Sequence, residues 1–102
     1  MSLFSFFGNG KIKQALLKGA IIIDVRPAGA FDQGRIPDSI NIPVDRIATN
    51  AEKIKNIRRP VVFCAAYSEH SSTATRIMKE KGLQEVYDGG NWQRVLKIVN
   101  KL

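Results

Sequence analysis

Short apolar runs alternate with longer stretches of helical spacing along this chain. The runs are too short for helices, and we expect strands in AIIID (residues 20–24), INIP (40–43), VVFC (61–64) and QEVYDGG (84–90). Helices are predicted between them, over residues 11–19, 28–32, 44–56, 71–81 and 91–102. This alternation predicts an α/β fold with a central, mostly parallel β-sheet and helices on both of its faces.

The chain has the organisation of one domain, because 102 residues suffice for a single modest core. We divide it into a hydrophobic N-terminal lead-in over residues 1–9 and a domain over residues 10–102. In the lead-in, Phe4 and Phe7 are expected to pack on the domain; a weak contact with a membrane or a partner is the alternative. A membrane span needs about 20 apolar residues, so we expect none here. The lead-in also lacks the basic start of a signal peptide.

The charge balance is strongly basic, with a net charge of +7 and a pI near 9.9. The basic residues are scattered, and no recognition-helix, zinc-finger or RNA-binding motif accompanies them. We therefore expect no specific nucleic-acid partner, but attraction of small anions or acidic proteins. The single cysteine excludes an intramolecular disulfide and a multi-cysteine zinc site. An unpaired thiol fits a reducing compartment, so we expect a cytoplasmic protein. We also expect a monomer that holds no metal or cofactor.

Three of the predicted strands end in residues that can form a site. Asp24 closes the first apolar run, Cys64 closes the third, and Gly89 and Gly90 end the last. The carboxyl ends of parallel strands meet at one edge of a sheet, where α/β proteins bind their ligands. We therefore expect these three segments to converge on one candidate site.

Cys64 is the candidate nucleophile, because a loop and a predicted helix start follow it. The candidate binding loop consists of Ala65, Ala66, Tyr67, Ser68, Glu69 and His70, with Ser71 at the helix start. Backbone amides in such a loop and at a helix N-terminus favour the thiolate, so we expect a lowered pKa for Cys64. The alternative is a buried cysteine that packs in the core as a small hydrophobic residue.

Three motifs in this chain resemble those of rhodanese-like domains. IIIDVRPAGAFDQGRIPDSINIP is similar to the family's opening motif hhhDVRxxxEFxxGHIPGAxNIP, where h is an apolar residue. VVFC with its loop and helix is similar to the family's active-site segment. VYDGGNW is similar to the closing hxGGxxxW motif, although the tryptophan comes earlier in this chain. The motifs occur in the family's order over residues 10–101, and the resemblance implies a rhodanese-like fold.

The resemblance also implies the chemistry of a sulfurtransferase or persulfide carrier. Cys64 would take the outer sulfur of a donor, which is a small sulfur anion such as thiosulfate or a protein persulfide. It would then pass this sulfur to a thiophilic acceptor. Asp24 and Arg26 match the family's DVR, and the resemblance implies that they support the site by an ion pair.

The loop lacks the family's arginine. Active rhodaneses carry Cys-x4-Arg, and the relatives with phosphatase or arsenate reductase activity carry Cys-x5-Arg. Counted from Cys64, these two arginine positions hold Glu69 and His70, neither of which offers an oxyanion a permanent forked contact. Two alternatives therefore stand beside the sulfurtransferase. One is a non-catalytic rhodanese-like binding module, and the other is a relative of the arsenate reductases and phosphatases.

Overall fold

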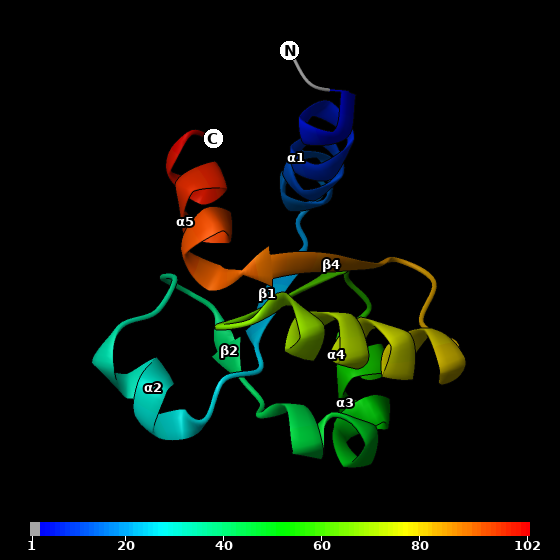
Figure 1. The fold of residues 1–102 in the computed structure, drawn as a ribbon. Helices are drawn as coiled ribbons and strands as arrows, with labels where there is room; N and C mark the ends of the chain where they lie inside the picture. The colour runs from blue at the N-terminus through cyan, green and yellow to red at the C-terminus, as the bar shows by residue number, and fades with distance from the viewer. Residues whose placement is uncertain (1–2) are drawn as a thin grey trace.

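The sheet of this protein has four parallel strands. The computed structural model describes residues 3–102, with side chains from residue 9 onward. The strands are β1 (Ile21–Asp24), β2 (Ile40–Asn41), β3 (Val61–Ala65) and β4 (Val86–Asn91), in the spatial order β2-β1-β3-β4 (Figure 1). All of the pairings are parallel, which confirms the predicted sheet.

Helices cover both faces of this sheet, as predicted. The helices are α1 (Leu3–Leu17), α2 (Ala28–Gln33), α3 (Ala51–Asn56), α4 (Ser68–Glu80) and α5 (Trp92–Asn100). Figure 1 shows α1 and α5 on one side of the sheet, α3 and α4 on the other, and α2 beyond the carboxyl end of β1. The chain therefore folds as a three-layer α/β domain.

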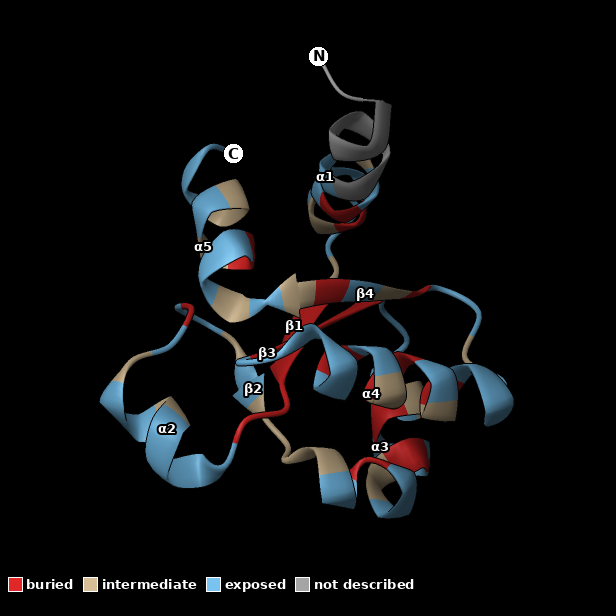
Figure 2. Ribbon diagram, viewed as in Figure 1, coloured by how far each residue is buried: buried red, intermediate tan, exposed pale blue. Residues whose placement is uncertain are grey.

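The central strand β3 separates two apolar clusters. Val61, Phe63 and Ala65 pack with residues of α3 and α4, while Val62 and Cys64 pack with residues of α1 and α5. Successive side chains of a strand point to opposite faces, so one buried strand contributes to both clusters. The buried residues in Figure 2 are concentrated on the strands and on the helix faces that meet them.

The helix predicted over residues 44–56 is only partly formed. The segment consists of two short 3₁₀ turns, η1 (Val44–Arg46) and η2 (Ala48–Asn50), followed by α3. The Thr49 hydroxyl and the Asn50 amide both donate to the Arg46 carbonyl, at 3.1 and 2.8 Å. Side chains that bond to nearby backbone in this way compete with regular helical hydrogen bonds. The apolar spacing was nevertheless informative, since Ile47 and Ile54 are fully buried.

The first helix is longer than predicted. It begins at Leu3, so it runs through the proposed division of the chain between residues 9 and 10. The side chains of Phe4 and Phe7 lie outside the described part of the chain, so their packing on the domain stays a prediction. The proposed boundary between residues 9 and 10 also stays a prediction. Within residues 3–102, no helix combines the length and apolar character needed to cross a bilayer.

The end of the sheet is closely packed at Gly89 in β4. A Cβ atom at this position would lie 2.7 Å from the Phe63 carbonyl oxygen and 2.8 Å from a methyl group of Val95. Only a residue without a side chain permits this approach between β4, β3 and α5.

Candidate functional site

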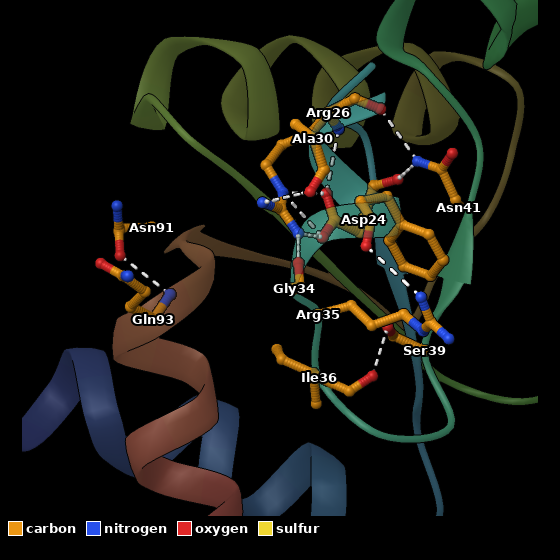
Figure 3. Close-up of polar contacts among 11 residues, drawn as sticks. Asp24, Arg26, Ala30, Gly34, Arg35, Ile36, Ser39, Asn41, Asn91 and Gln93 are labelled. Carbon is orange, nitrogen blue, oxygen red and sulfur yellow. Dashed lines mark hydrogen bonds and ion pairs between the residues drawn. The ribbon is translucent and has the colours of Figure 1, made fainter. Parts of the chain in front are cut away.

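The carboxyl end of β1 carries a buried ion pair. Asp24 is fully buried and Arg26 is 6% exposed. The Arg26 Nε donates to both carboxylate oxygens of Asp24 at 3.0 Å, and its Nη2 donates to Oδ2 at 2.8 Å. The backbone N–H of Arg26 also donates to Oδ1 at 3.0 Å (Figure 3). The carboxylate therefore fixes both the guanidinium and the backbone of the same residue.

The guanidinium of Arg26 ties two further segments, α2 and α5, to this ion pair. Its Nη2 donates to the Gly34 carbonyl at 2.6 Å, and its Nη1 to the Ala30 carbonyl at 3.4 Å, which holds α2 over the sheet end. Its central carbon lies 4.1 Å from the centre of the Trp92 ring, a distance typical of a cation–π contact. Trp92 is the first residue of α5, so the ion pair also fixes where that helix starts.

We call the ion pair of Asp24 and Arg26, with the segments bonded to it, the frame. Two asparagines complete it. The amide of Asn41 donates to the carbonyls of Asp24 and Arg26, both at 2.9 Å (Figure 3). Asn91 caps α5 by accepting from the N–H of Gln93 at 2.9 Å, and its own amide donates to the Ala66 carbonyl at 3.1 Å. Neither asparagine was predicted to take part in the site, although an asparagine directly before a helix is a common N-cap signal.

The loop after β3 is much shorter than the sequence suggested. Strand β3 continues to Ala65 and α4 begins at Ser68, so only Ala66 and Tyr67 connect them. Ser68, Glu69 and His70 form the exposed first turn of α4. The expectation of an extended loop from Ala65 to His70 around the thiol is therefore wrong. The seven-residue loop that motivated the phosphatase and arsenate reductase reading is also absent.

Ser71 anchors the start of α4 to β4. Its hydroxyl lies 2.6 Å from Oδ1 of Asp88, and the N–H of Gly90 donates to the same oxygen at 3.0 Å. The helix was expected to begin at Ser71, but Tyr67 occupies the N-cap position and provides no side-chain cap. Tyr67 is 66% exposed and meets the His70 ring edge-on at 6.1 Å between ring centres.

Cys64 lies inside the protein. Its side chain is fully buried among Ile12, Val62 and Val95, on the face of the sheet covered by α1 and α5. The neighbouring Ala65 belongs to the opposite cluster, under α4. The thiol therefore points away from the face on which the binding loop was expected.

The electrostatic surroundings of Cys64 oppose ionisation. Burial in apolar surroundings raises the pKa of the thiol, and the Asp24 carboxylate raises it further, while Arg26 partly compensates. Asp24 is the register partner of Cys64 in the neighbouring strand, which explains the repulsion. The expected lowering of this pKa is wrong, because the amides that were to stabilise a thiolate belong to α4 and not to a cradle around sulfur.

The predicted convergence of the three strand ends is confirmed. Asp24 and Cys64 lie side by side, and Gly89 contacts the backbone of β3. Glu69, His70 and the other exposed residues of the first turn of α4 lie at the same edge, since Ser71 bonds to Asp88 and the Ala66 carbonyl accepts from Asn91. The part of the site that is open to a ligand is the exposed first turn of α4, together with Tyr67 before it.

Comparison with known proteins gives a consistent assignment. The family model of the rhodanese-like domain matches residues 9–91. A relative from Pseudomonas savastanoi pv. phaseolicola, named thiosulfate sulfurtransferase GlpE, is 32% identical over 75 residues, which are 72% of this chain and 70% of the relative.

Two solved structures support the fold. A structure described as rhodanese with anions from E. coli has a TM-score of 0.67 at 23% identity, over 74% of this chain and 91% of that one. The human single-domain sulfurtransferase TSTD1 has a TM-score of 0.60 at 21% identity, over 93% and 89% of the two chains.

Proposed function

This chain belongs to the rhodanese-like family, and on that premise we propose that it acts as a non-catalytic binding domain of that family. One observation carries the proposal: the single thiol of the chain, Cys64, is fully buried on the side of the sheet opposite to Ala65. A nucleophile must reach its substrate and must ionise. The covering helices keep this thiol from a substrate, and burial raises its pKa, so both features support the proposal.

The position of the loop supports the same proposal. Active members of the family carry Cys-x4-Arg. A segment of that length ending at His70 begins at Ala65, the last residue of β3. In this register, alanine occupies the position of the nucleophile and histidine that of the arginine. Cys64 then corresponds to the residue before the nucleophile, which fits its place in the core.

The exposed first turn of α4 is the surface that we assign to binding. Tyr67 and His70 form an edge-on aromatic pair there, and Glu69 adds a carboxylate to the same turn. Exposed tyrosines are enriched among residues that contribute strongly to protein interfaces. A protein that carries a persulfide, or one that carries a thiophilic acceptor group, is the partner most in keeping with the family.

A second candidate is a persulfide carrier that uses Cys64, and the similarity to a thiosulfate sulfurtransferase favours it. The Cys64 thiolate would attack the outer sulfur of thiosulfate. A sulfur–sulfur bond would form to Cys64, the bond between the two donor sulfurs would break, and its electron pair would leave with sulfite. This route requires an opening of α1 or α5 that brings the thiol to the surface, because both helices cover it.

Intact mass after incubation with thiosulfate or a protein persulfide separates the two candidates. We expect no added sulfur on the wild type. A variant that restores the family pattern, Ala65→Cys with His70→Arg in a Cys64→Ala background, should gain one sulfur atom that cyanide removes. The triple variant should also form thiocyanate when cyanide is added, and the wild type should not.

The controls decide how each result is interpreted. Sulfur on the wild type that disappears in Cys64→Ala would reject the binding-domain proposal in favour of the carrier. Failure of the folded triple variant to accept sulfur would reject the register that places Ala65 at the nucleophile position. Circular dichroism on each variant establishes that it is folded.

A further inference from the structure

The amino ends of the strands form a second surface, opposite to the candidate site. The turns that lead into β1, β3 and β4 contain Lys18, the pair Arg58–Arg59, and Lys81. Because the strands are parallel, these turns meet at one edge of the sheet. In Figure 1 this edge lies where α4 ends and β4 begins.

Hydrogen bonds fix the turns against one another. The Arg59 Nε donates to the Gly19 carbonyl at 2.7 Å, which joins the turn before β3 to the turn before β1. The Lys55 ammonium donates to the Lys81 carbonyl at 3.0 Å, which joins α3 to the turn before β4. The cations therefore belong to one connected surface and not to independent loops.

This surface carries a surplus of positive charge. It holds five cations (Lys18, Lys55, Arg58, Arg59 and Lys81) against two carboxylates (Glu52 and Glu85), so five minus two leaves a net charge of +3. Of the five, Lys55 alone has a carboxylate within 4.0 Å in the described part of the chain, at 3.6 Å from Glu52. The other four present their charge without an ion-pair partner there.

Two exposed aliphatic residues directly precede cations of these turns in the sequence. Leu17 is 61% exposed and directly precedes Lys18, and Ile57 is 37% exposed and directly precedes Arg58. We name the surface formed by Leu17, Lys18, Ile57, Arg58, Arg59 and Lys81 the amino-end patch. It combines apolar side chains with unpaired cations on the outer edges of turns.

The backbone at Arg58 supports a role for its side chain. Its φ angle is +59°, in the left-handed region that glycine favours after a helix. An arginine in this conformation is strained relative to glycine, and its side chain forms no ion pair within the described residues. This turn closes α3, because the Arg58 N–H donates to the Lys55 carbonyl at 3.1 Å, and glycine would form it without strain. Arginine at a position that favours glycine points to a function of its side chain.

We propose that the amino-end patch docks this domain on an anionic phospholipid surface. The cations would contact phosphate and carboxylate headgroups, and Leu17 and Ile57 would insert between them. Nucleic acid fits less well, because single strands stack on aromatic side chains and the patch contains none. The docked domain would direct its opposite edge, with Tyr67 and His70, toward the solution.

Co-sedimentation of the full chain with lipid vesicles tests this proposal. We expect binding to vesicles of phosphatidylcholine mixed with phosphatidylserine, and little binding to phosphatidylcholine alone. Arg58→Gln with Arg59→Gln should reduce the bound fraction about tenfold. Leu17→Ser with Ile57→Ser should also weaken binding, although it leaves the charge unchanged. A matched control, Arg35→Gln with Arg46→Gln, removes the same charge outside the patch and should bind like the wild type.

Several outcomes would overturn the proposal. Absence of binding to the mixed vesicles would do so directly. An equal loss in the matched control would mean that binding follows the net charge of the whole chain and not the patch. Tighter binding of polyglutamate or duplex DNA than of the mixed vesicles at the same salt concentration would assign the patch to another partner. Thermal melting of each variant establishes that the result does not come from unfolding.

Discussion

The segments that follow β1 and β3 leave the same edge of the sheet, but their polar groups are satisfied in opposite ways. After β1, Asp24 and Arg26 are buried and bond to each other, to α2 and to the ring of Trp92. After β3, Tyr67, Glu69 and His70 extend into solvent. The first segment is a fixed frame, while the second presents exposed side chains to the solvent.

The difference separates two contributions to a rhodanese-like site. The frame depends on buried bonds within one short stretch of sequence, and it is fully formed in this chain. The chemistry depends on which side chain occupies the last position of β3, and there the chain has an alanine. On the proposed register, this domain keeps the architecture of the family with an alanine at the position of the nucleophile.

The largest expected effect comes from breaking the frame. Asp24→Asn leaves the Arg26 guanidinium buried without its counter-charge, which should lower the free energy of unfolding by about 3–5 kcal/mol. Glu69→Gln, the matched change after β3, should alter it by less than about 0.5 kcal/mol. Urea denaturation measures both. Similar losses in the two variants would show that the segments do not differ in the way described.

A second prediction tests how tightly the end of β3 is held. Gly89→Ala places a methyl group against the Phe63 carbonyl and Val95, and overpacking of this kind should cost about 1–3 kcal/mol. Gly29→Ala in α2 is the matched control. A Cβ at Gly29 has no neighbour within 4 Å, so the change should stabilise the protein by up to about 1 kcal/mol. A neutral Gly89→Ala would mean that the end of β3 can move.

Much of the fold followed from the sequence because it depends on local patterns. The run IIID became a strand buried on both faces, and the spacing of Ile47 and Ile54 marked a buried side even where the helix broke into 3₁₀ turns. The resemblance of the DVR stretch to the family's motif also predicted the ion pair of Asp24 and Arg26, which the structure contains.

The buried position of Cys64, the candidate nucleophile, was missed for a reason that local patterns do not reveal. A strand end can be misplaced by one residue, and one residue reverses the face to which every side chain points. Ending the strand at Cys64 put the thiol at the site, whereas ending it at Ala65 puts the thiol in the core. Contacts between distant segments, such as Ser71 with Asp88 or Asn91 with Ala66, were likewise not predicted.

A third prediction concerns the thiol that lies between the two regions. Because the folded protein raises the pKa of Cys64, the unfolded state ionises first as the pH rises above about 8.5. The stability that the buried, protonated thiol contributes is complete below that pH and is lost above it. Relative to Cys64→Ala, the wild type should lose about 1.4 kcal/mol per pH unit there. Parallel stability curves for the two proteins would contradict the burial of the thiol.

The smallest effect is expected at Arg58, just before β3. A substitution there should raise the free energy of unfolding, whereas the changes in the frame lower it. Arg58 has a left-handed backbone and no ion-pair partner in the described part of the chain, so Arg58→Gly should raise the free energy of unfolding by about 1 kcal/mol. Arg58→Ala is the matched control, because alanine keeps the strain and should bring no gain. Thermal and urea denaturation of the three proteins measure the difference. The glycine variant should also bind mixed phosphatidylserine vesicles less than the wild type, so that stability rises while docking falls. A glycine variant that is no more stable than the alanine variant would show that the turn carries no strain, and the backbone would then give no support to a function for Arg58.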